Sequence, residues 1–295
     1  MKVSFRDSEL TLRMILTAGG LAVLYLAFLS ILYYLGVDVS FLAVIAAILL
    51  FSQYYFSDKL VLMSLGAKIV NEREAPELHS IVSKLSREAG IPKPRVAVIP
   101  TPVPNALATG RNLRNSVIAV TEGLLSTLTR EEIEAVLAHE ISHIRNRDVL
   151  VLTIASFISM LAWFVMRSAL FYGMFGGSQR DRNGGAAIIL WVVSAVVWFI
   201  SFLLIRALSR IREFSADRGS AVITGNPEAL ISALLKISGK MTRIPEDEMK
   251  RVEGANAFFI VPAISRDSIL SLFATHPPIE KRIERLKELQ RVLRR

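Results

Sequence analysis

The chain has 295 residues, of which 52% are hydrophobic, and its mean hydropathy of +0.45 is too high for an ordinary soluble domain. It contains no cysteine, which excludes disulfides and thiolate metal ligands. The net charge of +9 is compatible with a nucleic-acid partner, but no nucleic-acid-binding motif accompanies it. Basic residues beside anionic lipid explain the charge more simply, so we expect a lipid bilayer and no nucleic acid as partner.

Four stretches of 18 to 22 residues carry no charge, and each approaches or exceeds the length that a helix needs to cross a bilayer. They are Met14–Leu35, Val39–Phe56, Val149–Met166 and Ala186–Ile205. The alternative, buried helices of a large soluble core, is disfavoured because one chain would need four of them. The first stretch is longer than the apolar region of a typical signal peptide and a second follows at once, so we expect a retained transmembrane hairpin.

Basic residues predict the orientation of these spans. Most of them lie in the N-terminal tail and at the span ends next to the polar segments. The opposite loops hold only Arg167, Arg180 and Arg182. The positive-inside rule therefore places both termini and the polar segments in the cytoplasm of a multi-pass cell-membrane protein.

The polar segment between the second and third spans begins with a predicted helix at Pro76, which has an apolar face at helical spacing. We expect His79 on it to be an ordinary helix residue. Three strand signals follow at Arg95–Ile99, Ala106–Thr109 and Ser116–Val120, separated by proline and glycine. The sequence thus predicts a small β-sheet within a mainly α-helical protein.

A capping box at Thr129–Glu132 then begins a helix that carries His139-Glu140-Ile141-Ser142-His143. Two histidines four residues apart lie on one face of a helix, where both rings can bind one Zn²⁺. Glu140 is then placed to act as general base toward a water molecule. The chain has only four histidines, so the pattern is unlikely to arise by chance.

Catalytic zinc usually takes three protein ligands. The metzincin pattern would need glycine at position 146 and histidine at 149, but the chain has Asn146 and Val149. The helix of the fourth span is predicted to continue through Arg206–Val222, where Glu213 and Asp217 share a face. Glu213 is the strongest candidate ligand, with Asp217 accepting a ring N–H of a histidine ligand. On spacing alone, surface ion pairs with neighbouring arginines explain the two carboxylates equally well.

Two further helices are predicted, one from Asn226-Pro227 to about Gly239 and a basic amphipathic one from Pro278 to the C-terminus. His276 precedes two prolines and, taken alone, is typical of a helix start.

Four blocks of this sequence resemble the HtpX family of membrane-embedded zinc metalloproteases, which are distant relatives of the CAAX prenyl proteases. The blocks are Asn105-Ala106-Leu107-Ala108-Thr109-Gly110, His139-Glu140-Ile141-Ser142-His143, Arg212-Glu213-Phe214-Ser215-Ala216-Asp217 and Thr275-His276-Pro277-Pro278. They occur in the family's order among the same four spans. One departure is Leu107, where the family often has an aromatic residue.

The resemblance implies one Zn²⁺ per chain, with Glu213 as third ligand and Asp217 supporting it. It also implies that Asn105 and His276 line the cleft, where they bind substrate or stabilise the oxyanion.

We therefore expect four transmembrane helices and a cytoplasmic, zincin-like (gluzincin) α+β catalytic domain. Residues 1–56 and 149–205 form two transmembrane hairpins, and residues 57–148 and 206–295 form the two parts of the catalytic domain. The resemblance implies an endopeptidase whose substrates are polypeptides, in particular damaged or misfolded membrane proteins. The alternatives are a specific CAAX-type processing protease, disfavoured by the number of spans, and a catalytically silent membrane scaffold, disfavoured by the intact motif.

Overall fold

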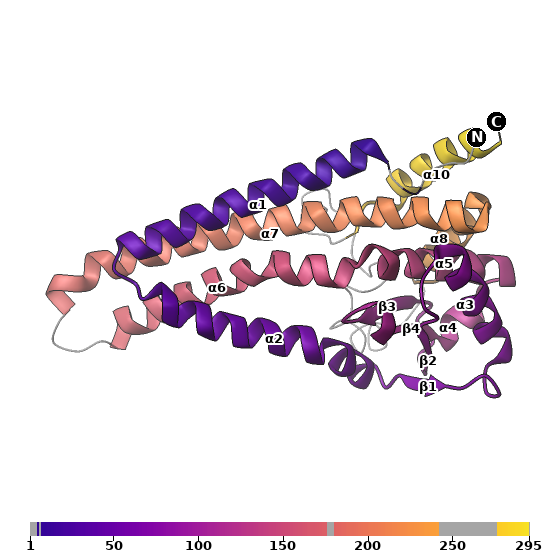
Figure 1. Ribbon diagram of the computed structural model, residues 1–295, viewed down its shortest axis with the longest axis horizontal. Coiled ribbons are helices and arrows are strands. Elements are labelled where there is room, and N and C mark those ends of the chain that lie inside the picture. Colours follow the sequence, from indigo (N-terminus) through magenta and orange to yellow (C-terminus); the bar gives the residue numbers. More distant parts are fainter. Residues whose placement is uncertain (1–4, 6, 176–179, 242–275, 295) are drawn as a thin grey trace. The chain divides into compact units, whose positions relative to one another are not determined.

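The structure is a computed structural model that describes residue 5 and residues 7–175, 180–241 and 276–294 (Figure 1). The helices are α1 (Ser8–Tyr34), α2 (Val39–Ser64), α3 (Pro76–Ala89), α4 (Glu122–Leu125), α5 (Arg130–Asn146), α6 (Asp148–Phe175), α7 (Arg180–Thr224), α8 (Pro227–Met241) and α10 (Ile279–Leu293), with a short 3₁₀ turn at Leu113–Asn115. The strands are β1 (Lys68–Val70), β2 (Arg95–Ile99), β3 (Ala106–Gly110) and β4 (Ser116–Thr121). Thr275, the first residue of the fourth block that resembles the HtpX family, lies outside the described residues.

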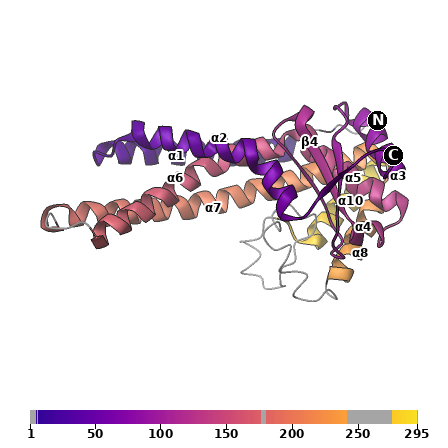
Figure 2. The ribbon, with the colours of Figure 1, turned by 90° about the horizontal axis from the view of Figure 1, so that it is seen from below.

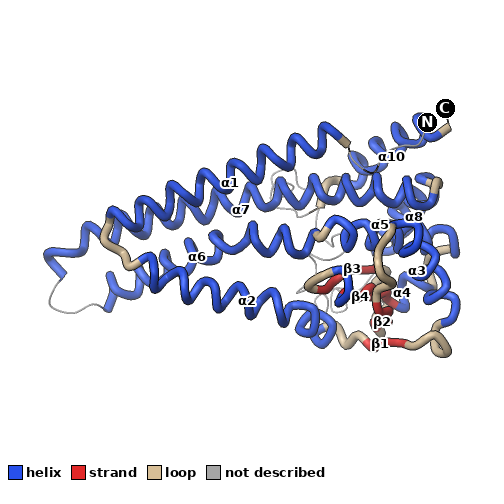
Figure 3. The backbone as a smooth tube through the Cα atoms, in the orientation of Figure 1, coloured by secondary structure: helices blue, strands red, loops and turns tan. Residues whose placement is uncertain are grey.

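The chain divides into two units. One comprises residues 1–11, 55–150 and 209–295, and the other comprises residues 12–54 and 151–208. Every strand among the described residues, red in Figure 3, belongs to the first unit. The first unit also holds all the candidate site residues.

The described residues of the second unit lie mainly in apolar helices. Within the part of the chain that the structure describes, three helices are long and apolar enough to span a bilayer, namely Ser8–Tyr34, Asp148–Leu170 and Ala187–Thr224. The predicted second span does form a helix, α2. The apolar segment found within it, Ala47–Phe56, is shorter than the three candidate spans, so a fourth crossing stays a prediction.

Large apolar side chains on these helices are exposed, among them Leu16, Val23 and Ile188, each roughly two-thirds accessible. Such a surface is unfavourable in water and suits hydrocarbon. Inside the unit, Phe28 and Leu32 of α1 are fully buried in a cluster of apolar side chains from α6 and α7.

The first unit contains a four-stranded mixed sheet with the order β1-β2-β4-β3. β2 and β4 are parallel, whereas β1 and β3 pair antiparallel with their neighbours. β2, β3 and β4 confirm the three predicted strands. β1 was not predicted from the sequence, because it has only three residues and is largely exposed. β3 is an edge strand of this sheet.

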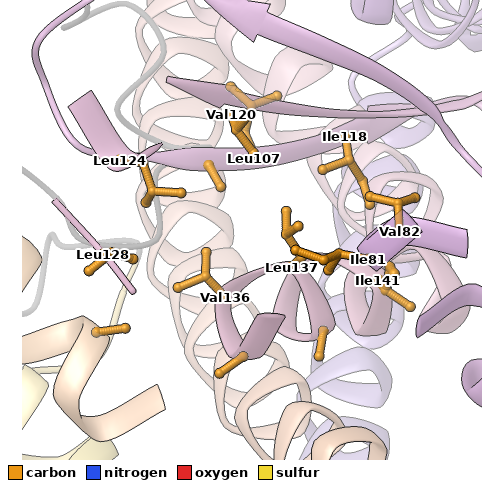
Figure 4. Close-up of a cluster of buried hydrophobic side chains, with 14 of the residues drawn as sticks. Ile81, Val82, Leu107, Ile118, Val120, Leu124, Leu128, Val136, Leu137 and Ile141 are labelled. Atoms are coloured by element: carbon orange, nitrogen blue, oxygen red, sulfur yellow. The ribbon is translucent and has the colours of Figure 1, made fainter. Parts of the chain in front are cut away.

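Helix α5 packs against the sheet through its apolar face. Figure 4 shows Leu137 and Ile141 of this helix in one cluster with Ile118 of β4 and Val82 of α3, and all four are fully buried. Burying a side chain of this size contributes about 1.5–3 kcal/mol. The two histidines of the His-Glu-x-x-His motif each follow one of these two apolar residues of α5 by two positions. Because a helix has 3.6 residues per turn, two positions place them on the opposite face, away from the sheet.

The start of α5 is fixed by the predicted capping box, which is present between Thr129 and Glu132. The Glu132 carboxylate also accepts hydrogen bonds from Ser232 (2.6 Å) and Lys236 (2.9 Å) of α8. α8 in turn packs on α10, drawn in yellow in Figures 1 and 2. The C-terminal helices are thereby attached to the helix that carries the His-Glu-x-x-His motif.

Candidate metal centre

The two histidines of the motif face each other at the C-terminal half of α5. Nε2 of His139 lies 3.1 Å from Nε2 of His143. His139 is buried, with 1% of its side chain exposed, whereas His143 is 17% exposed. The i, i+4 spacing therefore brings the two rings together as the sequence predicts.

Glu213 of α7 brings a carboxylate to the same point. Its Oε1 lies 3.3 Å from His143 Nε2, and its Oε2 lies 3.6 Å from His139 Nε2. One donor atom from each of the three residues lies within 4.8 Å of the others, which suits a single metal ion. The alternative that Glu213 is only a surface ion-pair residue does not fit its burial.

A glycine brings α7 close to α5. A Cβ atom at Gly219 would lie 2.2 Å from Ser142 Oγ and 2.7 Å from Ser142 Cβ. At the neighbouring position the hydroxyl of Ser220 donates a hydrogen bond of 2.7 Å to the Ala135 carbonyl of α5. This close contact places Glu213 within reach of residues that are about 70 positions earlier in the sequence.

Behind His139 lies a buried chain of charges, which we call the His139 arm: His139, Asp217 and Arg282. The ring Nδ1 of His139 is 3.0 Å from Asp217 Oδ1, as predicted for the supporting carboxylate. Arg282 of α10 binds the same carboxylate twice, from Nε at 2.9 Å and from Nη2 at 2.6 Å. Its Nη1 also lies 3.5 Å from Glu213 Oε2. Arg282 is 1% exposed, and no sequence pattern predicts its place in the site.

Behind His143 lies a second chain, which we call the His143 arm: His143, Asp148 and Arg212. The ring Nδ1 of His143 is 2.5 Å from Asp148 Oδ2. Arg212 forms an ion pair with Asp148 and donates a 2.9 Å hydrogen bond to the Asn146 carbonyl. The sequence predicts Arg212 only as a juxtamembrane charge or a surface ion-pair partner, and it predicts no role for Asp148.

The backbone explains how Asp148 reaches His143. Helix α5 ends in a left-handed residue, Arg147, with φ of 56° and ψ of 41°, and α6 begins at the next position. Arg147 is the sole residue other than glycine with positive φ in the part of the chain that the structure describes. The sharp turn directs the first carboxylate of α6 back to the last turn of α5.

The two arms fix the protonation of the rings and thereby favour a cation. A carboxylate lies beside each Nδ1 and favours the tautomer with the proton there, which leaves Nε2 of each ring for a cation when one is bound. The two Nε2 atoms, 3.1 Å apart, and the Glu213 carboxylate together form a point that would attract a cation. The donor set of two imidazoles and a carboxylate suits Zn²⁺, although the donors alone do not exclude another divalent metal.

Glu140 is buried on the same helix, with 3% exposure. Burial raises the pKa of its carboxyl group, opposed by the positive charge that His139 and His143 carry when protonated and by a hydrogen bond from the Ala108 backbone. That hydrogen bond also connects the predicted general base to edge strand β3.

The structure places His276 in the same cluster, with Nε2 3.6 Å from Glu213 Oε1. Burial lowers the pKa of His276 to about 4. Asn105 is buried at the start of β3, where its side chain accepts a 2.8 Å hydrogen bond from Ala106 N–H and its backbone binds Thr121. For both residues, a role toward substrate stays a prediction. His79, in contrast, lies 3.0 Å from the Val70 carbonyl on β1.

A helical His-Glu-x-x-His motif that converges with a glutamate from a later helix defines a metal-dependent peptidase site. The comparisons agree: residues 72–290 match the model of Peptidase family M48, and the chain belongs to this family. It is 54% identical over 285 residues to "Protease HtpX homolog 2" of Methanosarcina mazei, with 97% of both chains covered. It is 53% identical to "Protease HtpX homolog" of Moorella thermoacetica, with 96% of this chain and 95% of that protein covered.

Among solved structures, the chain is similar to the crystal structure of S. mikatae Ste24p, with a TM-score of 0.57 and 19% sequence identity. The match covers 95% of this chain and 67% of the Ste24p chain. That likeness shows a shared fold. The chain is thus a membrane metalloprotease with polypeptide substrates, as the resemblance to the HtpX family implied.

Proposed function

We propose that the chain is a zinc-dependent endopeptidase that cleaves misfolded or damaged membrane proteins at the cytoplasmic face of the cell membrane. The observation that carries the zinc assignment is the convergence of one nitrogen from each of two histidine rings and one buried carboxylate at a single point. The basic residues next to the polar segments support the cytoplasmic orientation.

In this proposal His139, His143 and Glu213 hold the metal, and the two arms orient the histidines. A zinc ion held by these residues would supply Lewis-acid chemistry, namely a lower pKa of a water molecule and polarisation of the scissile carbonyl. Glu140 removes the proton from the attacking water and delivers it to the leaving amine. Its raised pKa suits a group that must first accept and then release a proton.

His276 and Asn105 are the candidates for binding the carbonyl oxygen as it becomes negatively charged. An extended peptide beside edge strand β3 would be held by main-chain hydrogen bonds, which require no particular side chains. Such binding fits a protease whose substrates share an unfolded state and not one sequence. Residues 1–56 and 149–205 would serve as transmembrane hairpins, and residues 57–148 and 206–295 as the catalytic domain.

The test combines metal analysis with proteolysis on the full-length protein in detergent. We expect wild type to contain one zinc per chain and to cleave a destabilised membrane protein faster than its folded form. Glu140→Gln should keep the zinc and lose about 10²- to 10⁴-fold in rate, because only the proton transfer is removed. Glu213→Ala should lose the zinc. An active Glu140→Gln protein would contradict the assignment of the general base, and a Glu213→Ala protein with full zinc would remove Glu213 from the ligands.

A further inference from the structure

Residue 5 and residues 7–11, in the segment that precedes the first apolar stretch, belong to the first unit, which holds the metal centre. Within the segment, the Phe5 ring lies 3.8 Å from the guanidinium carbon of Arg145. Asp7 Oδ2 lies 3.3 Å from Arg218 Nη1, and Glu9 Oε1 lies 3.8 Å from Arg285 Nη2. Three residues in alternate positions thus contact three arginines.

These arginines lie on the three helices that build the metal centre. Arg145 follows His143 by two positions on α5, and Arg218 follows Asp217 directly on α7. Arg285 lies nearly one turn after Arg282 on α10, and its guanidinium carbon is 4.4 Å from the ring of Phe214, the neighbour of Glu213. Each contact is therefore made within one helical turn of a ligand or of a residue that supports one.

Asp7 holds the segment in one conformation. Its Oδ1 accepts the backbone N–H groups of Glu9 (2.9 Å) and Leu10 (3.2 Å) at the start of α1, while its Oδ2 faces Arg218. One carboxylate thus caps the start of α1 and faces Arg218 of α7 at the same time. The Asp7 side chain is 30% exposed and that of Arg218 is 17% exposed, so this ion pair is partly shielded from water.

We propose that Phe5, Asp7 and Glu9 form a positioning segment for the metal centre, which fixes α5, α7 and α10 relative to one another. The inference rests on the proposed metal site, because its effect is on metal binding. The competing explanation is three surface contacts, each contributing about 0–1 kcal/mol to stability and nothing to the metal. The difference is measurable: a positioning segment changes metal affinity and ligand geometry, and surface contacts change neither.

The test uses the full-length protein in detergent with Phe5→Ala and Asp7→Asn combined. Asparagine still caps a helix, so Asp7→Asn removes the charge toward Arg218 and keeps α1. The matched control is Asp38→Asn, the same change at the start of α2, where Asp38 Oδ1 accepts the Ser40 N–H at 3.0 Å. Zinc affinity is measured by competition with a chromophoric chelator, and ligand geometry by the absorption spectrum of the Co²⁺-substituted protein.

We expect the double variant to bind zinc about tenfold more weakly, at the low end of the effect of residues that support metal ligands. Its Co²⁺ spectrum should shift, and the control should match wild type. Asp7→Glu in place of Asp7→Asn keeps the negative charge toward Arg218 and should restore most of the affinity. Unchanged affinity and spectrum in the double variant would overturn the inference and leave the metal site intact. If the double variant does not fold, a wild-type affinity in Asp7→Asn alone would overturn it equally. A wild-type protein that binds no zinc would overturn the proposed function together with the inference.

Discussion

The two arms of the metal centre contain the same chemistry and differ in how the chain builds them. In each, a histidine directs Nδ1 at an aspartate that an arginine neutralises. His143 and Asp148 are only five residues apart, joined by the sharp turn at Arg147. In contrast, the His139 arm takes its three residues from α5, α7 and α10. One arm thus depends mainly on a local turn, and the other on the packing of three helices.

The largest difference between the arms should follow from Arg282→Met. The substitution leaves the Asp217 carboxylate buried without its bidentate partner, and breaking a buried ion pair from one side typically costs about 3–5 kcal/mol. We expect the melting temperature of the metal-free protein to fall strongly, measured by thermal unfolding in detergent. The matched control is Lys287→Met, an exposed position of the same helix, with little expected change. A metal-free Arg282→Met protein as stable as wild type would contradict the structural importance of the His139 arm.

The aspartates allow a direct comparison of the arms through metal affinity. Asp148→Asn and Asp217→Asn each remove the negative charge that orients a histidine ligand, which typically costs 10- to 100-fold in affinity. We expect the larger loss for Asp217→Asn, because Arg282 binds this carboxylate through two nitrogens and its side chain is more deeply buried than that of Arg212, 1% against 6% exposed.

Competition with a chromophoric chelator measures both affinities in the same buffer. Equal losses would mean that the burial of the His139 arm adds nothing to its function. No loss in either variant would show that the aspartates do not act on the ligands.

The sequence predicted the parts of this centre that repeat locally. The i, i+4 spacing placed His139 with His143 and Glu213 with Asp217, and the capping box predicted the helix start. Apolar length predicted the helices of the second unit, and short strand signals separated by proline and glycine predicted three strands of the sheet. These patterns depend only on the geometry of one helix or one strand.

The missed residues depend on contacts between distant segments. Arg212 and Arg282 looked like ordinary juxtamembrane and surface charges, because nothing near them in sequence indicates burial. Asp148 carried a usable signal, since it is a carboxylate five residues after a histidine ligand, directly before an apolar stretch. Its interpretation required the left-handed turn at Arg147, which a non-glycine residue rarely adopts and the sequence therefore does not predict.

The smallest expected effect concerns Gly219, where α7, which carries Asp217 and Arg212, contacts α5, which carries both histidines. Gly219→Ala places a methyl group against Ser142, so α5 and α7 must shift apart at a cost of about 1–3 kcal/mol. The matched control is Gly239→Ala in α8, where an added Cβ would meet no atom within 4 Å outside the backbone of its own helix, and alanine should stabilise the helix by up to about 1 kcal/mol.

Glu213 lies on α7 and both histidines lie on α5, so the shift caused by Gly219→Ala should also weaken zinc binding, measured alongside thermal unfolding. A destabilised Gly219→Ala protein with wild-type zinc affinity would show that the distance between the helices does not control the centre. In that case helix packing would not distinguish the two arms, and the difference between them would lie in their buried charges alone. Weakened binding would show that the packing of α7 on α5 controls ligand geometry directly, in addition to the aspartates and arginines behind the rings.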